Sequence, residues 1–340
     1  MTEIDLSRHS QKAPSMDPLE SVVWGYRFSE SGDAEELKGA ALRTAIERQD
    51  SWIWLHFDLT DTRAHAAISS LPMLPPDAVE VLLSTDDHQR IGTYDHAVAG
   101  VVADFERADT IEVRQMVRWH FCMAPHLFIS ARRRPLLTLN SMQNAIQGGK
   151  RLHGVADLFH AIIHAFAAAM TALMRQYADA LDDVEDGLLD AKEAGDYEAL
   201  GLVRRSAVRL HRQAVPLRAM LRHLLEDRPA WFNDDAAQDC EAMARRVESL
   251  CADLQSLQER AHALQDELSA RQADQTNNRL TMLSVVATLL MPPTLVSGIY
   301  GMNVEGLPFK DQPWAFVFTV VLLIGSVLTG LFVLRRMKLV

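Results

Sequence analysis

Short apolar runs alternate with turn residues over the first part of the chain. Five runs between residues 21 and 134 have the composition of β-strands. They are SVVWGYRF, SWIWLHFDL, HAVAGVVADF, MVRWHFCMA and HLFISARR. Two stretches between them, roughly 33–48 and 62–83, have helical spacing. We therefore predict an α/β domain with a mixed sheet over residues 21–150, preceded by a polar segment, 1–20.

The pattern becomes helical after about residue 150. Helices are predicted over 155–193 and 197–227, and a third begins near Asp234 and continues without a break into an apolar stretch. A helix of about 60 residues is roughly 90 Å long and needs neighbouring helices to bury its apolar side. We expect residues 151–279 to form a stalk, or funnel, of long helices.

Two uncharged stretches near the C-terminus, 280–300 and 314–334, are each 21 residues long. Each can cross a hydrocarbon core of about 30 Å as a helix. Basic residues precede the first stretch and follow the second, whereas the loop between them, 304–313, has a single lysine. Because positive residues stay on the cytoplasmic side, the sequence predicts two membrane spans, 280–303 and 314–334, a basic tail, 335–340, and two cytoplasmic termini.

The net charge of −11 is unevenly distributed, because the loop contributes −1 and the tail +3, which leaves −13 for residues 1–279. Such a field disfavours nucleic-acid binding, despite local basic clusters such as ARRRP, and attracts cations to the inner mouth of a pore. The three cysteines show no CxxC spacing and fit a reducing compartment. The sequence contains no recognisable triad, phosphate loop or catalytic carboxylate pair, so we predict that the protein is not an enzyme.

The first span ends in MPPTLVSGIYGMN (291–303), and a second span and a short basic tail follow it. This arrangement resembles the CorA superfamily of divalent-cation transporters, whose signature is Gly-Met-Asn at the outer end of the first of two C-terminal spans. Three further segments, SWIWLHFDLTD, VRLHRQAVPLRAMLRHL and VEGLPF, resemble the ZntB-like zinc-transporter branch. Glu305 departs from that branch, which has glycine at this position.

The resemblance implies an α+β membrane protein with a cytosolic α/β domain, a funnel of long helices and two transmembrane helices. It implies a homopentamer in the lipid bilayer of the bacterial inner membrane, Zn²⁺ uptake and no prosthetic group. Mg²⁺, Co²⁺, Ni²⁺ and Cd²⁺ are the other candidate cargoes. A Mg²⁺/Co²⁺ channel of the CorA type is the alternative within transport. Alternatives of other classes are a membrane-anchored oligomeric scaffold and a membrane-tethered hydrolase.

The resemblance places a selectivity filter on Gly301, Met302 and Asn303. A carboxamide oxygen can hydrogen-bond the water shell of a divalent ion without holding the ion too firmly to release it. One asparagine cannot encircle a hydrated ion, so a symmetric ring of asparagines is needed. From the residues alone, glycine and asparagine at this place also fit a helix C-cap.

The resemblance assigns the pore lining to Asn277, Leu283, Met291 and Thr294 as well as Asn303. At about 100° per residue, several further positions fall within about 80° of Met291 on one helix face. They are Leu280, Ala287, Gly298 and Gly301. We expect Leu283 and Met291 to act as apolar constrictions, and the glycines to let helices approach closely. The hydroxyls of a neighbouring row are expected to bond their own backbone or another helix. That row is Thr281, Ser284 and Thr288.

Acidic residues extend the predicted ion path on both sides. Asp266 lies three helical turns before Asn277 on the same face, and Glu259 lies two turns further back. In a ring, both would gather cations at the inner mouth, although Glu259 also fits a solvated coiled-coil face. Glu305 would attract cations at the outer loop.

Two clusters have the character of metal ligands. His160 and His164 lie one helical turn apart, which is metal-ligand spacing, but their apolar neighbours favour core packing. Asp86, Asp87 and His88 in STDDHQR form a candidate regulatory metal site, although such a turn is usually solvated.

Neither span contains an Asp, Glu, Lys, Arg or His, which pumps and proton relays normally need. An inward membrane potential contributes about 4.6 kcal/mol per 100 mV to the entry of a divalent ion. The sequence therefore predicts passive import. A proton-coupled variant would have to carry its proton on water, on Glu305 or in the funnel.

Overall fold

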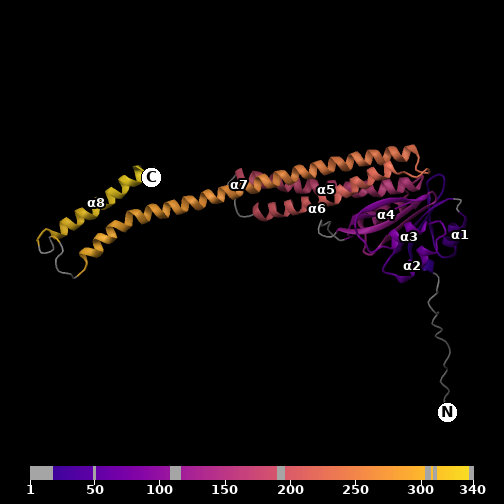
Figure 1. Ribbon diagram of the computed structural model, residues 1–340, viewed down its shortest axis with the longest axis horizontal. Helices are drawn as coiled ribbons and strands as arrows, with labels where there is room; N and C mark the ends of the chain where they lie inside the picture. Colours follow the sequence, from indigo (N-terminus) through magenta and orange to yellow (C-terminus); the bar gives the residue numbers. More distant parts are fainter. Residues whose placement is uncertain are drawn as a thin grey trace, which may run out of the picture. The chain divides into compact units, whose positions relative to one another are not determined.

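The structure is a computed structural model that describes residues 18–48, 51–107, 116–189, 196–302, 308 and 312–336 (Figure 1). The chain divides into two compact units, residues 1–262 and 263–340. Most of the predicted polar segment 1–20 lies outside the described residues.

The first unit contains a mixed sheet, as predicted. In the described residues, seven strands lie in the order β2-β1-β3-β7-β6-β5-β4. All neighbours are antiparallel except β3 and β7, which are parallel. The strands are β1 (Val22–Phe28), β2 (Ala34–Leu37), β3 (Trp52–Asp58), β4 (Arg90–Tyr94), β5 (Ala97–Phe105), β6 (Met116–Ala124) and β7 (Leu127–Arg132). The five predicted strands are β1, β3, β5, β6 and β7.

Two predicted helices in this unit were wrong in part. The stretch 33–48 begins with β2, which pairs with β1, and the helix α1 covers only Ala40–Arg48. Gly39, with a φ of +54°, separates the two elements. The stretch 62–83 forms two helices, α2 (Thr62–Ser69) and α3 (Pro76–Leu83), because the prolines of LPMLPP cannot donate helical hydrogen bonds.

Helices cover both faces of the sheet. Side chains alternate along β3, so that Trp52 and Trp54 contribute to one core, whereas Ile53, Leu55 and Phe57 contribute to the other. The second core includes residues of α1, α2 and α3. The first includes residues of α4 (Leu137–Gln147), which was not predicted, and of the long helices. Burial on both faces explains why β3 and β5 read as continuous apolar runs.

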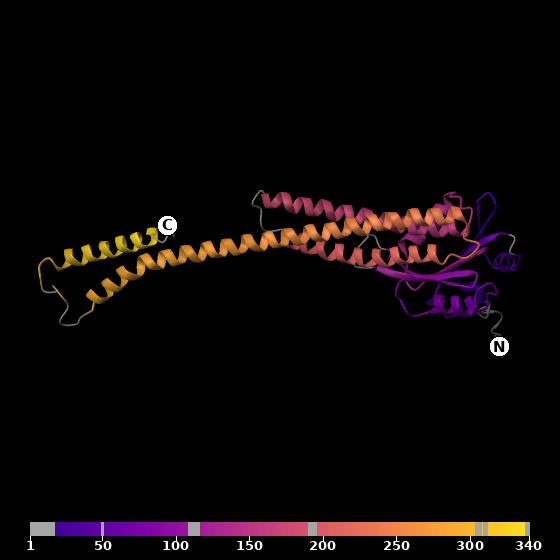
Figure 2. The ribbon, with the colours of Figure 1, turned by 45° about the horizontal axis from the view of Figure 1, so that its top comes forward.

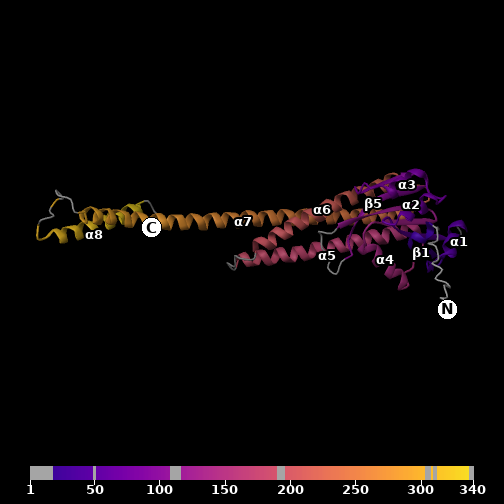
Figure 3. The same cartoon turned by 90° about the horizontal axis from the view of Figure 1, so that it is seen from below.

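Three long helices were predicted, and the structure contains them as α5 (Val155–Leu189), α6 (Asp196–Glu226) and α7 (Asp234–Tyr300). In the first unit, α5, α6 and the first part of α7 run side by side (Figure 2, Figure 3) and share an apolar core. On the surface, Arg260 of α7 forms ion pairs of 2.6 and 3.0 Å with Asp182 and Glu185 of α5. The first part of α7 is therefore supported by α5 and α6, which bury its apolar side as a helix of this length requires.

The second unit contains the rest of α7 and the helix α8 (Ala315–Arg336). In the described residues, three helices, α5, α7 and α8, are long and apolar enough to span a membrane. Much of the apolar stretch of α5 is buried, so α5 is a core helix, whereas those of α7 and α8 are almost wholly exposed. Exposed apolar side chains over a whole helix require lipid or other protein around them.

Candidate cation pore

The predicted filter lies where α7 ends. Gly301 follows the last helical residue, Tyr300, and its N–H donates to Ser297 O at 2.9 Å. A methyl group added to Gly301 would lie 3.1 Å from the same oxygen, so the turn is tight. Gly301 does not have a positive φ and therefore does not form a left-handed C-cap. Asn303 and Glu305 lie outside the described residues, and their roles stay predictions.

One face of α7 carries a shallow, mostly apolar groove. It brings together three predicted pore positions, Met291, Thr294 and Gly298, with Met302 of the predicted filter. The other lining residues are Ala287, Leu290, Leu295 and Ile299. Leu283 lies outside this groove, and its side chain and that of Met291 are exposed by 67% and 69%. A groove on a single helix cannot enclose an ion, but it can form one wall of a pore.

The predicted inner positions also lie on the surface of α7. Asn277, Asp266 and Glu259 are all exposed. The carboxylate of Glu259 accepts a hydrogen bond of 3.0 Å from Gln255, one turn away. This contact fits a solvated helix face as well as an inner mouth.

Hydroxyl groups near the groove bond the backbone of their own helix. The Oγ1 of Thr288 donates to Ser284 O at 2.8 Å, which confirms the expectation for this residue. Thr294 does the same with Leu290 O at 2.7 Å. Its hydroxyl oxygen keeps its lone pairs, which remain able to accept a hydrogen bond from the water shell of an ion.

The helix α7 contains two prolines close to the place where α8 contacts it. Pro292 and Pro293 have no N–H, so the carbonyls of Thr288 and Leu289 lose their helical donors. Gly330 of α8 lies at this place, since a methyl group added to it would be 3.6 Å from Leu289 Cδ2 and 3.7 Å from Thr288 O. The small residue lets the two helices of the second unit meet where the hydrogen-bond ladder is interrupted.

The two histidines on α5 differ in burial, because His160 is half-buried and His164 is exposed. His164 is exposed, which makes the predicted core packing wrong for this residue. The rings of His160 and His164 lie 6.2 Å apart, and Arg246 NH1 lies 2.7 Å from Nε2 of His164. Partial loss of hydration around its ring lowers the pKa of His164, and the charge of Arg246 acts in the same direction. The guanidinium occupies the lone pair that a metal ion would need.

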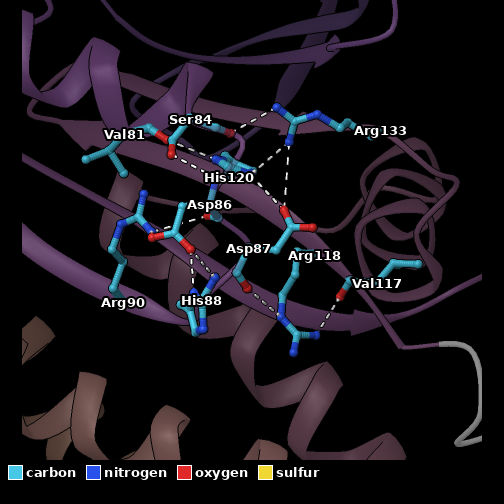
Figure 4. Close-up of polar contacts among 10 residues, drawn as sticks. All are labelled: Val81, Ser84, Asp86, Asp87, His88, Arg90, Val117, Arg118, His120 and Arg133. Carbon is cyan, nitrogen blue, oxygen red and sulfur yellow. Dashed lines mark hydrogen bonds and ion pairs between the residues drawn. The ribbon is translucent and has the colours of Figure 1, made fainter.

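The Asp86 loop is held by internal contacts (Figure 4). Oδ1 of Asp86 lies 2.5 Å from Nδ1 of His88, and Oδ2 lies 2.6 Å from Arg90 NH1. The hydrogen bonds from the ring and the backbone N–H of His88 lower the pKa of Asp86, and the charge of Arg90 acts in the same direction. Asp87 faces the other way, 3.9 Å from both Arg133 and His120. Among the described residues, no three His, Cys, Asp or Glu side chains are grouped to hold a metal ion.

Sequence reasoning missed the partners of this loop. Arg118 and His120 come from β6 and Arg133 follows β7, so only the sheet brings them to residues 84–90. The basic cluster ARRRP could be recognised in the sequence. Its position next to the acidic loop 84–90 could not be predicted, because the sheet brings two distant segments together.

Comparisons with known proteins identify the family. The family described as "CorA-like Mg2+ transporter protein" matches residues 49–336. A relative from Yersinia enterocolitica, "Zinc transport protein ZntB", is 23% identical over 320 residues, which cover 94% of this chain and 96% of the relative.

Two solved structures share the fold. The full-length CmaX protein matches with a TM-score of 0.80 and 23% identity, over 93% of this chain and 98% of that one. The CorA magnesium transporter from Methanocaldococcus jannaschii matches with a TM-score of 0.75 and 17% identity, over 92% and 98%. These relatives are transporters and not enzymes. The chain belongs to the family of CorA-like Mg²⁺ transporter proteins, and its resemblance to the ZntB-like branch is supported.

Proposed function

We propose that the chain is the subunit of a pore that imports divalent cations, with Zn²⁺ as the preferred cargo. The observation that carries this proposal is the groove on α7, which joins Met291, Thr294, Gly298 and Met302 directly before Asn303. Family membership supports cation transport. The preference for Zn²⁺ rests on the relative named as a zinc transport protein, at 23% identity.

We further propose a homopentamer in the bacterial inner membrane. The exposed apolar faces of α7 and α8 call for lipid on one side and for copies of the chain on the other. We propose a cytosolic domain over residues 21–150, a funnel over 151–279, spans at 280–303 and 314–334 and an outer loop at 304–313. The apolar pattern supports these bounds, and the basic flanks support the orientation. Both termini are then cytoplasmic.

Each pore residue has a defined role in this proposal. A ring of Asn303 hydrogen-bonds the water shell of the entering ion, on the backbone turn made by Gly301 and Met302. Leu283 and Met291 form apolar constrictions, below which Asn277 contacts the ion's water shell. Asp266 and Glu259 raise the cation concentration at the inner mouth, and Glu305 does so at the outer one.

The membrane potential is a sufficient driving force for the entry of a divalent cation. Residues 280–300 and 314–334 contain no Asp, Glu, Lys, Arg or His to serve as a proton relay. The potential supplies about 4.6 kcal/mol per 100 mV for a divalent ion. If protons are coupled to transport, they travel on water or on residues outside the spans.

The cargo is tested by flux into proteoliposomes that contain the purified full chain, with Zn²⁺ and Mg²⁺ measured separately and in competition. The proposal expects faster Zn²⁺ entry and inhibition of Mg²⁺ entry by Zn²⁺. Faster Mg²⁺ entry would establish the alternative, a Mg²⁺/Co²⁺ channel, which the family's description favours. If neither ion crosses although the oligomer is intact, the scaffold alternative replaces transport.

A further inference from the structure

β6 and the segment after β7 place arginines around a cavity next to the Asp86 loop, and Figure 4 shows two of them, Arg118 and Arg133. The volume of the cavity is about 470 Å³, which is within the usual range of small-molecule sites. The lining residues are Asp87, Met116, Val117, Arg118, Arg133 and Arg134. We propose that this cavity binds a small multivalent oxyanion, a molecule with phosphate or carboxylate groups, between Arg118 and Arg133.

Arg118 carries a positive charge that no carboxylate neutralises by direct contact. Its Nε donates to Asp87 O at 3.1 Å, its Nη1 to Val117 O at 3.3 Å and its Nη2 to Gln213 Oε1 at 2.8 Å. These acceptors are neutral, and a guanidinium has five N–H donors, so two are left for a ligand. In the described part of the chain, Arg118 forms no ion pair.

The environment of Arg118 favours an added negative charge. The side chain is half-buried, and burial lowers its pKa. The nearby charge of Arg212 acts in the same direction, while that of Asp87 opposes it. A bound anion would compensate both the lost hydration and the like charge.

Arg133 supplies a second fixed guanidinium. Its Nη2 donates to Ser84 O at 2.9 Å, and its Nη1 lies 3.3 Å from Nε2 of His120. The carboxylate of Asp87 lies 3.9 Å away, too far for a hydrogen bond. Contacts to carbonyls and to His120 hold the arginines in place, and the long ion pair with Asp87 neutralises Arg133 only in part. Guanidinium groups that are already held in position can form charge-assisted hydrogen bonds to phosphate and carboxylate oxygens.

Arg134 completes the rim in a weaker role. It is 67% exposed and lies 3.5 Å from Glu106, which neutralises it in part. The lining therefore has three positive groups against one negative group, in a region of the sequence that is otherwise strongly acidic. This local reversal of charge distinguishes the cavity from the cation path on α7.

The test is isothermal titration of the full chain in detergent with pyrophosphate and, separately, with citrate, in metal-free buffer of low chloride concentration. We expect saturable binding of one anion per chain that weakens as salt is added. Arg118→Gln should weaken binding at least tenfold. The matched control is Arg90→Gln, because Arg90 pairs with Asp86 and does not line the cavity.

The two probes separate phosphate from carboxylate recognition. Binding unchanged in Arg118→Gln, an equal loss in Arg90→Gln, or no saturable binding of either probe would overturn the proposal. If Arg118→Gln does not fold, Arg133→Gln must show the tenfold loss, and unchanged binding in that variant would equally overturn it.

Discussion

Asp104 gives the first unit a built-in dependence on pH. Its side chain is fully buried on β5, and its carboxylate accepts hydrogen bonds from the N–H of Phe105 at 2.7 Å and of Thr138 at 3.0 Å. Thr138 lies in the first turn of α4, whose own N-cap residue, Leu136, provides no side-chain acceptor. Asp104 thus caps a helix from a distant strand. Burial raises its pKa to about 6, although these hydrogen bonds act in the opposite direction.

The consequence for stability follows from the sign of this shift. The folded state binds the proton more tightly than the unfolded state, whose pKa is 3.8. The stabilisation is therefore complete below pH 3.8 and is lost as pH rises through 6. The rise in the pKa of Asp104 from 3.8 to about 6 corresponds to a stabilisation of about 3 kcal/mol in total, and roughly half of it is lost between about pH 5 and about pH 7.5.

Asp104→Asn keeps an acceptor oxygen for Thr138 but cannot ionise. We expect the difference in stability between variant and wild type to move in favour of the variant by more than about 1 kcal/mol from pH 5 to 7.5. For a unit of this size, that is a relative change in Tm of about 3 °C. Thermal unfolding of the full chain in detergent at both pH values measures it.

The control is Asp77→Asn, which removes an exposed carboxylate from the first turn of α3. Its Tm should follow that of the wild type at both pH values. If Asp104→Asn also follows the wild type in parallel, Asp104 does not titrate near pH 6 and the reasoning is refuted.

Two further outcomes are expected. Burial lowers the pKa of His56 well below 6.5, and its Nε2 accepts a hydrogen bond from Nε of Arg132 at 3.1 Å. The ring therefore stays neutral in the folded state. Because the unfolded state binds the proton more readily, the contribution of His56 to stability falls as pH drops below 6.5. Nitrogen NMR of labelled histidines should find the neutral ring at pH 5.5, and a midpoint at or above 6.5 would contradict this. Gly330→Leu should reduce cation flux about tenfold or more by forcing α8 away from Thr288, whereas Gly330→Ala, whose methyl group fits, should keep most of it. Equal flux in these two variants would exclude a role for the helix contact.

Local patterns sufficed for much of the fold. β6 and the long helices have apolar periodicity over many residues, and their bounds are close to those predicted. β2 was missed because AEEL consists of good helix formers, and only its pairing with β1 makes it a strand. The prediction of one helix over 62–83 was wrong because apolar spacing continues through the proline segment, although prolines interrupt the helical hydrogen bonds there.

The candidate sites were predictable to different degrees. The pore face on α7 depends on the spacing within one helix, so a helical wheel places Met291, Thr294 and Gly298 together, as the groove does. The arginine cavity joins residues from a loop, β6 and the end of β7, and nothing in the sequence states that these meet. The contact between His164 and Arg246 likewise joins two helices across 82 positions.

Zn²⁺ flux into proteoliposomes for Asn303→Ala beside Asn278→Ala tests the proposed pore most directly. Both changes remove a carboxamide, but Asn278 is exposed on a face of α7 away from Met291. We expect Asn303→Ala to lose nearly all flux while the oligomer stays intact, and Asn278→Ala to transport like the wild type. Wild-type flux in Asn303→Ala would contradict the central claim that the chain conducts cations through a ring of this residue.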